Sequence, residues 1–170
     1  MLGHQQGGSF EDLDRLPEAP RHTELIDGAL VFMLSPQRSW HGRLVTALTT
    51  TLMAQAPDGF EVEREMTIRL DARNRLEPDL LLTNLAYDPD RTWYDLEDVK
   101  LVVETVSPES AHRDRTVKLR KYAEAGTPHY WCIEDEGGAP VVHAPAGIFQ
   151  RPVPFEISTD LDKLTPPRSS

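Results

Sequence analysis

The chain has a single cysteine, Cys132, and no long run of apolar residues. One cysteine excludes an internal disulfide and is typical of proteins in a reducing compartment. No apolar stretch reaches the roughly 20 residues that a membrane-spanning helix needs, and the N-terminal residues lack the apolar core of a signal peptide. We therefore expect a cytoplasmic protein that does not enter the membrane. Cys132 itself lies in the apolar segment Tyr130–Ile133, which indicates a buried, inert thiol and aromatic residues that fill a core.

Positive charge is also scarce, with 18 basic residues against 28 acidic ones and a formal net charge of −10. A body of this charge repels nucleic acid overall. The charged residues are unevenly distributed along the chain. Five cations and only one acid, Asp114, lie between Arg113 and Lys121. That local cationic segment fits either a solvated helix surface or a surface that holds phosphates.

Large apolar residues are few at both ends of the chain, in residues 1–20 and 161–170. We expect both segments to be flexible, and the stretch from Leu164 to Ser170 not to pack. The remaining residues, 21–160, have the length of a single domain with its own core.

The most informative stretch is the apolar run Leu101–Val106, which is typical of a strand covered on both faces. Glu104 lies in the middle of it. A carboxylate in such a place costs several kcal/mol unless a cation or metal pairs with it. Ser107-Pro108 ends the strand, and a basic helix is predicted from Ala111 to Ala125, with Gly126 and Pro128 as its stop.

The other predicted elements follow from local patterns. They are a hairpin over residues 23–34 with an Asp27-Gly28 turn, a helix from Trp40 to Gln55 capped by Ser39, one strand with alternating polarity over residues 60–70, and strands over 79–83, 129–133, 140–144 and 155–157. This order predicts an α/β fold, in which a mixed β-sheet is flanked by helices and preceded by an N-terminal β-hairpin.

Asp79 and Glu104 are the two acids in the most apolar strands. If the strands are neighbours, the carboxylates lie close together and repel each other unless they share a cation. Carboxylate and carbonyl oxygens suit Mg²⁺ (or Mn²⁺), which can activate a bound water and neutralise charge on a phosphate. The alternative is that both acids accept hydrogen bonds from backbone amides at strand ends.

Five short motifs occur in register between Glu24 and Asp135. They are Glu24-Leu-Ile-Asp-Gly28, Glu77-Pro-Asp-Leu80, Val102-Val-Glu-Thr-Val-Ser-Pro108, Asp114-x-x-x-Lys118-x-x-x-Tyr122 and Gly126-Thr-Pro-His-Tyr-Trp131. With them the chain resembles the Uma-two family of endonucleases, within the PD-(D/E)XK restriction-endonuclease-like superfamily. The resemblance implies a restriction-endonuclease-like core, a divalent metal, and cleavage of phosphodiester bonds in nucleic acid, with DNA as the expected substrate.

The resemblance also assigns residues. Asp79 corresponds to the aspartate of the superfamily's first motif and Glu104 to the first acid of its second, and the Thr105 backbone carbonyl would complete the metal ligands. The usual lysine lies two residues after that acid, where this chain has Val106. The resemblance suggests a lysine displaced onto the following helix, at Lys118, which would act on the charge of the reacting phosphate and contribute little to folding.

Further residues are candidates for supporting roles. Asp114, Lys118 and Tyr122 recur every four residues and so share a helix face, where Asp114 could orient Lys118; a solvent-facing ion pair is the alternative. The accessory candidates are Glu24, His41, Asp114 and Tyr122, and the candidates for phosphate contact are Arg113, Arg115, Arg120 and Lys121. A homodimer would suit the cutting of two strands. The rival function is a catalytically inactive module of the same fold that binds nucleic acid or a protein partner.

Overall fold

The computed structural model describes residues 8–16, 20–32, 37–107, 110–143, 155–158, 160 and 163–164. Their elements, in chain order, are α1 (Phe10–Asp14), β1 (Thr23–Ile26), β2 (Ala29–Phe32), α2 (Ser39–Gln55), β3 (Glu61–Arg64), β4 (Thr67–Asp71), β5 (Asn74–Leu76), β6 (Leu80–Thr83), β7 (Trp93–Asp95), the 3₁₀ helix η1 (Leu96–Asp98), β8 (Val99–Val106), the π-helix η2 (Arg113–Lys118), α3 (Leu119–Ala125), β9 (Tyr130–Glu136) and β10 (Ala139–His143).

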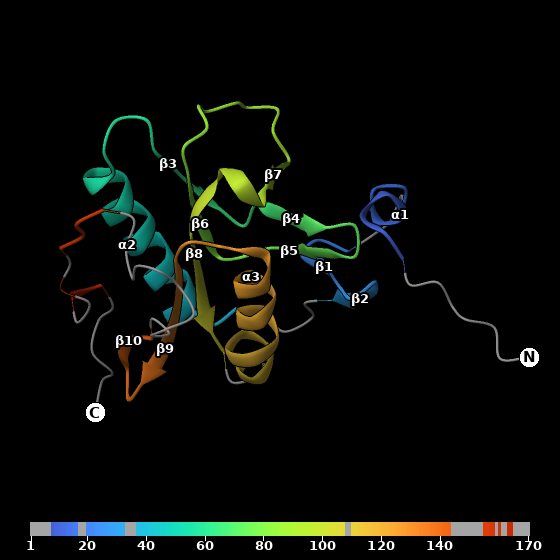
Figure 1. Ribbon diagram of the computed structural model, residues 1–170. Helices are drawn as coiled ribbons and strands as arrows, with labels where there is room; N and C mark the ends of the chain where they lie inside the picture. Colours follow the sequence, from blue (N-terminus) through green and yellow to red (C-terminus); the bar gives the residue numbers. More distant parts are fainter. Residues whose placement is uncertain are drawn as a thin grey trace, which may run out of the picture.

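The strands form two five-stranded mixed sheets (Figure 1). Sheet A has the order β2-β1-β5-β4-β7, and sheet B has the order β10-β9-β8-β6-β3. In sheet B, β8 runs parallel to β9 and antiparallel to β6. The connection from β8 to β9 passes through η2 and α3, so the basic segment of the sequence is the crossover of a parallel βαβ unit. The predicted α/β class with a mixed sheet and helices is confirmed.

Two apolar clusters cover the two faces of sheet B. On one face, Leu44, Val45, Leu48 and Leu52 of α2 pack on residues that include Leu101, Val103 and Ile133. On the other face, Tyr122 of α3 packs with Val102 and Val106, and with Ile68 and Leu76 of sheet A. Because β8 is covered on both sides, its sequence is apolar almost throughout, and every residue from Leu101 to Val106 is buried.

The predicted hairpin is confirmed for β1 and β2. Its turn residues Asp27 and Gly28 have φ values of 52° and 81°, the left-handed pair that a type I′ turn requires. The hairpin positions proposed at 33–34 lie outside the described residues. The stripe of α2 is buried as predicted, but Ser39 is its first helical residue rather than its cap, a position that Arg38 takes.

The single strand predicted over residues 60–70 is wrong. The chain instead leaves sheet B after β3 and enters sheet A with β4, and Glu65 between them has a φ of 52°. The alternation of polar and apolar residues fails at the break, where Glu63, Arg64 and Glu65 are three consecutive charged residues, and it resumes at Met66. The change of sheet therefore coincides with an interruption of the period-two pattern, which the prediction of a single strand did not take into account.

The two ends of the chain also differ from expectation. Within residues 1–20, α1 forms and buries Leu13, and Asp14 pairs with Arg69 and Arg75 of sheet A. The strand predicted over residues 155–157 is wrong, since residues 155–158 form no strand, although Phe155 and Ile157 pack against the cluster beneath α2. Leu164, which was expected not to pack, contacts the same cluster. No helix in the described part of the chain has the length and apolar character to cross a membrane.

Candidate active site

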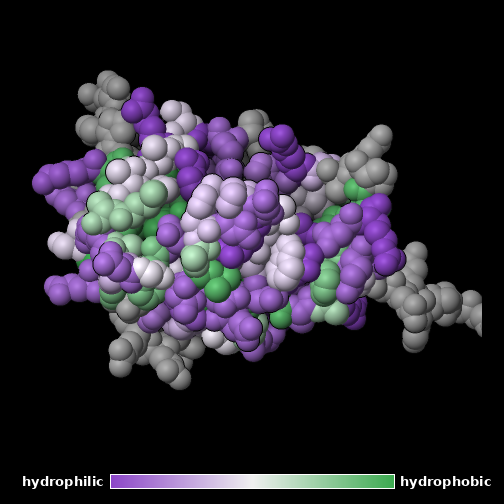
Figure 2. All heavy atoms as spheres, turned by 90° about the horizontal axis from the view of Figure 1, so that it is seen from above, coloured by the Kyte–Doolittle hydropathy of each residue, from purple (hydrophilic) through white to green (hydrophobic). Residues whose placement is uncertain are grey.

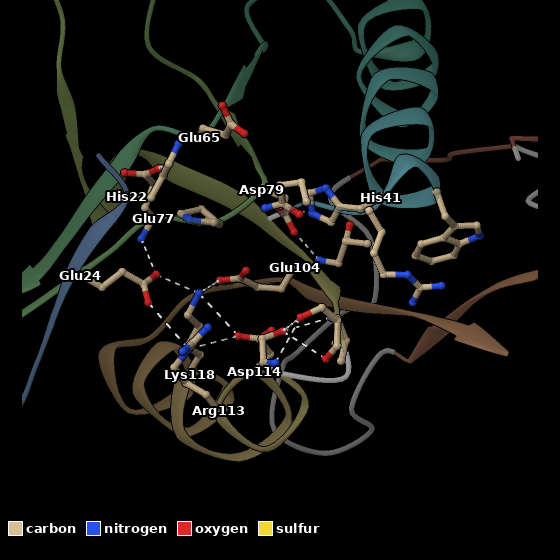
Figure 3. A pocket seen from close by; sticks show the side chains of 18 of the residues that line it. His22, Glu24, His41, Glu65, Glu77, Asp79, Glu104, Arg113, Asp114 and Lys118 are labelled. Atoms are coloured by element: carbon tan, nitrogen blue, oxygen red, sulfur yellow. Dashed lines mark hydrogen bonds and ion pairs between the residues drawn. The ribbon is translucent and has the colours of Figure 1, made fainter. Parts of the chain in front are cut away.

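A pocket of about 240 Å³ lies where the two sheets meet the start of α2 and the π-helix η2. Its walls come from β1 and β2, from the residues before β6, from the end of β8 and from η2 (Figure 3). Sequence-distant segments thus converge on it. The predicted residues Glu24, His41, Asp79, Glu104, Thr105, Arg113, Asp114 and Lys118 all line this pocket.

The two predicted metal-binding acids are brought together by strand register. Leu80 of β6 pairs with Val103 of the antiparallel strand β8. The residue before Leu80 therefore lies across from the residue after Val103, which places Asp79 opposite Glu104. The condition on which the sequence argument depended, that the two strands are neighbours, is confirmed.

Both oxygens of the Asp79 carboxylate are held. His41 of α2 places Nε2 at 2.8 Å from Oδ1, and the Thr105 backbone N–H donates to Oδ2 at 2.5 Å. His41, which was predicted as an accessory residue, is buried. These two contacts fix the orientation of Asp79 at the pocket wall, while each oxygen keeps a lone pair for a further ligand.

Lys118 is surrounded by three carboxylates deep in the molecule. Its Nζ lies 2.8 Å from Glu24 Oε1, 2.9 Å from Glu104 Oε1 and 3.6 Å from Asp114 Oδ1. Only 2% of the Lys118 side chain is exposed. The predicted pairing of Asp114 with Lys118 is present, and it lies in the interior, so it is not the solvent-facing ion pair given as the alternative. Because Glu24 belongs to sheet A and Glu104 to sheet B, the ammonium joins the two sheets.

Acid outnumbers base in this cluster, and the pKa values reflect it. Burial raises the pKa of Glu104 well above its ordinary value, against the influence of Lys118, and burial likewise raises the pKa of Asp114. For Lys118, burial alone would lower the pKa, but Glu104, Glu24 and Asp114 together outweigh it and raise the pKa. The ammonium therefore stays protonated at any working pH and cannot serve as a base.

The π-helix gives this part of the site its shape. Residues Arg113–Lys118 have π geometry, and the chain returns to α-helix from Leu119 until Gly126, whose φ of 90° ends it. A π turn widens the helix by about one residue per turn and is frequent at functional sites. Two residues of this π-helix, Asp114 and Lys118, are buried. An uninterrupted α-helix was predicted for this segment, since i+4 spacing does not distinguish the two geometries.

The ionisable groups of the pocket suit a hard divalent cation. Three permanent cations face six acids, namely Glu24, Glu65, Glu77, Asp79, Glu104 and Asp114. Two buried carboxylate oxygens, Glu24 Oε2 and Asp114 Oδ1, have no hydrogen-bond partner among the described residues. Surplus negative charge presented by oxygen donors fits Mg²⁺ or Mn²⁺.

The other predicted residues lie outside the pocket lining. Tyr122 is fully buried in the core, 5.5 Å from the ring of Tyr130, and burial raises its pKa. Arg115 pairs with Glu134, Arg120 with Glu124 at 3.8 Å, and Lys121 with Asp27. A role for these three cations in phosphate binding stays a prediction. Cys132 is buried, and burial raises the pKa of its thiol to about 12, in accord with an inert group.

Sequence reasoning missed several residues that line the pocket: His22, Phe32, Gln37, Arg38, Trp40, Glu65, Pro78, Ser107 and Ser110, and Glu77 beyond its place in a motif. Glu77 could have been predicted from the sequence, because it directly precedes the Pro78-Asp79 pair. The residues around the start of α2 carried no local signal, since only the packing of α2 on sheet B brings them to the pocket.

Comparison with known proteins places this pocket in a family. The sequence pattern of the Uma2 family, described as "Putative restriction endonuclease", matches residues 10–168. The chain belongs to the Uma2 family. Every residue described above as part of the pocket lies inside that match. The Uma2 match also extends past both limits expected for the domain, 21 and 160.

A solved structure supports the fold of this Uma2 chain. The crystal structure of a "putative nuclease belonging to DUF820" from Anabaena variabilis ATCC 29413 is similar with a TM-score of 0.58. The similarity covers 81% of this chain and 80% of that one, at 16% sequence identity. A search of curated proteins finds no match. The restriction-endonuclease-like architecture expected from the sequence is confirmed.

Proposed function

We propose that the protein is a metal-dependent endonuclease that hydrolyses phosphodiester bonds of nucleic acid, with DNA as the substrate. The observation that carries the proposal is the pairing of Asp79 with Glu104 across β6 and β8, at the wall of a pocket with surplus negative charge. Membership of a family described as restriction endonucleases supports a nuclease function in general. An inactive binding module would have no need for two acids brought together at such electrostatic cost.

Asp79 and Glu104, with the Thr105 carbonyl, would hold the divalent metal. When bound, Mg²⁺ would supply Lewis-acid chemistry, polarising a phosphate oxygen and lowering the pKa of a water. His41 keeps the Asp79 carboxylate in one orientation through its 2.8 Å contact. Preorganised ligands of this kind reduce the reorganisation required when charge develops on the phosphate.

Lys118 contributes in two ways in this proposal. Its ammonium keeps Glu104 oriented through a 2.9 Å hydrogen bond, and it offsets part of the carboxylate charge that would otherwise repel a phosphate. Arg113 lies on the same wall, with Nε 4.0 Å from Glu24 and 3.8 Å from Asp114, and 22% of its side chain is exposed. It is the one cation of the predicted phosphate-binding set that lines the pocket.

The experiment is a cleavage assay with purified protein on DNA and RNA, in Mg²⁺, in Mn²⁺ and in EDTA. We expect endonucleolytic products that require the metal and are lost in Asp79→Asn. The control is Glu124→Gln, since Glu124 is an exposed acid of α3 outside the pocket. An Asp79→Asn protein that cleaves as fast as the parent would contradict the proposed function.

Metal binding should also stabilise the fold. Mutual repulsion of the pocket acids is relieved by a divalent cation, and a ligand that binds only the folded state raises its stability by mass action, by about 2.7 kcal/mol at a hundredfold excess over Kd. We expect a higher melting temperature at millimolar Mg²⁺ than in EDTA, and no such shift in Asp79→Ala. An equal shift in both proteins, measured by differential scanning fluorimetry, would place the metal elsewhere.

A further inference from the structure

The pocket has a rim that differs in chemistry from its floor. The floor consists of Asp79, Glu104 and Lys118, whose side chains are 14%, 4% and 2% exposed. The rim carries Phe32 at the end of β2 together with Gln37, Arg38 and Trp40 at the start of α2. Phe32 is 45% exposed and the Arg38 side chain 42%. None of these four residues belongs to the proposed catalytic set.

The recessed floor limits which nucleic acid can reach it. A phosphate must enter the pocket to approach Asp79 and Glu104, because so little of either side chain is exposed. A duplex holds its phosphates on a stiff helix with a persistence length of about 50 nm. An unpaired strand bends at individual backbone bonds, so it can lead one phosphate inward while its bases remain outside.

Two rim side chains, Phe32 and Trp40, are aromatic, which is the type of side chain that unpaired bases stack on. Aromatic rings stack on exposed bases, and nearby cations hold the backbone. The Trp40 indole Nε1–H donates to the Gly138 carbonyl at 3.3 Å, which fixes the position of the ring. One Arg38 nitrogen donates to Asp135 at 2.9 Å, and the guanidinium has further N–H groups for a phosphate. Arg113 supplies a second cation on the η2 wall.

The negative net charge of the molecule also favours a single strand over a duplex as the ligand. Duplex DNA carries one negative charge per about 1.7 Å of axis, and tight binding requires many phosphate contacts. The protein has a net charge of −10 and pairs Arg115, Arg120 and Lys121 with acids away from the pocket. The face seen in Figure 2 is mostly hydrophilic, with hydrophobic residues in small separate areas. A few contacts at the rim, strengthened by stacking, suit a single strand better than a duplex.

We propose that the pocket takes an unpaired strand of nucleic acid, with Phe32 and Trp40 stacking on its bases and Arg38 and Arg113 holding the phosphates on either side of the reacting one. This inference names the substrate class of the proposed nuclease and rests on that function. In this proposal the main binding surface is the pocket rim, and not the helix surface that carries Arg115, Arg120 and Lys121.

Binding tests the proposal apart from cleavage. Fluorescence anisotropy with the Asp79→Asn protein in Mg²⁺ would compare a labelled single strand of roughly 15 nucleotides, as DNA and as RNA, with the matching DNA duplex. We expect the single strand to bind at least about tenfold more tightly than the duplex. Phe32→Ala and Arg38→Gln, each added to this background, should weaken single-strand binding by about tenfold, the loss typical of one stacked base or one well-made contact.

Matched controls come from the same elements. Leu30 is 40% exposed on the same strand as Phe32 but does not line the pocket, and Arg43 is an exposed arginine on α2, the helix that Arg38 caps, and does not line it either. We expect Leu30→Ala and Arg43→Gln to change binding by less than twofold. Tighter binding of the duplex, or a Phe32→Ala protein that binds like Leu30→Ala, overturns the inference. Cleavage of duplex alone would leave the nuclease function intact and remove this inference, whereas no binding and no cleavage of any probe would remove both.

Discussion

Replacing Lys118 by methionine should destabilise the protein by about 3–5 kcal/mol at neutral pH, the usual cost of leaving a buried charge without its partner. Three carboxylates surround the ammonium within 2.8–3.6 Å, and methionine leaves all three without it. Urea denaturation in EDTA measures the loss. Activity should disappear as well, since Glu104 loses the group that orients it.

The loss should depend on pH in a definite direction. Burial, partly offset by Lys118, raises the pKa values of Glu104 and Asp114 in the folded protein, and removal of the ammonium should raise them further. A carboxyl with a raised folded-state pKa favours folding at low pH and loses that contribution as the pH rises through the folded-state pKa. The variant should therefore approach the parent below about pH 4.5 and differ most above about pH 7.

Lys121→Met is the matched control for Lys118→Met. Lys121 lies three residues further along, and its side chain is 12% exposed, while its partner Asp27 is 62% exposed. Because water screens the exposed carboxylate, this pair contributes much less to stability than the fully buried contacts of Lys118. Equal losses in the two variants, or a Lys118→Met loss that grows at low pH, would contradict the buried cluster described above.

Glu104→Gln should lower metal-dependent cleavage by about a thousandfold or more, because a metal contributes several kcal/mol to charge stabilisation in the transition state. The same change should leave stability in EDTA within about 1 kcal/mol of the parent. It removes one of the surplus buried acids, and Lys118 keeps its 2.8 Å contact with Glu24. Single-turnover cleavage and urea denaturation measure these two quantities.

The control for Glu104→Gln is Glu124→Gln, a change of the same kind at an acid of α3 that is 63% exposed. It should leave cleavage and metal affinity unchanged. A Glu104→Gln protein that keeps cleavage within tenfold of the parent would exclude Glu104 as a metal ligand. Loss of activity together with a large loss of stability would instead indicate a structural role.

The sequence predicted the acids of the site because they break local rules. Glu104 is a charge within a buried strand, and Asp79 starts another, so each stood out against its apolar neighbours. The resemblance to the Uma-two family added Lys118, which its helical surroundings alone would not distinguish from a solvated lysine. The sheet class and the crossover helix followed from apolar runs and from the Gly126 stop, which are local signals.

What the sequence could not predict depends on tertiary contacts. The charged run from Glu63 to Glu65 interrupts the alternating pattern but does not indicate that the chain passes from one sheet to another, and nothing local places Arg38 or Trp40 in the same pocket as Asp79. The sequence also predicted Lys118 as an ammonium with little part in folding. Its near-complete burial depends on tertiary structure, since Glu24 of sheet A and Glu104 of sheet B both contact its ammonium.

The contact of Lys118 with Glu24 and Glu104 has a consequence for the order in which the molecule folds. Glu24 is far from both Glu104 and Lys118 in the chain, and contacts between distant residues carry a loop-closure cost that delays them relative to local structure. Hairpins and helices can form while the three groups are still separately hydrated. The centre is therefore complete only after both sheets have docked, so a chain that is partly synthesised or partly folded should have no means of cutting nucleic acid.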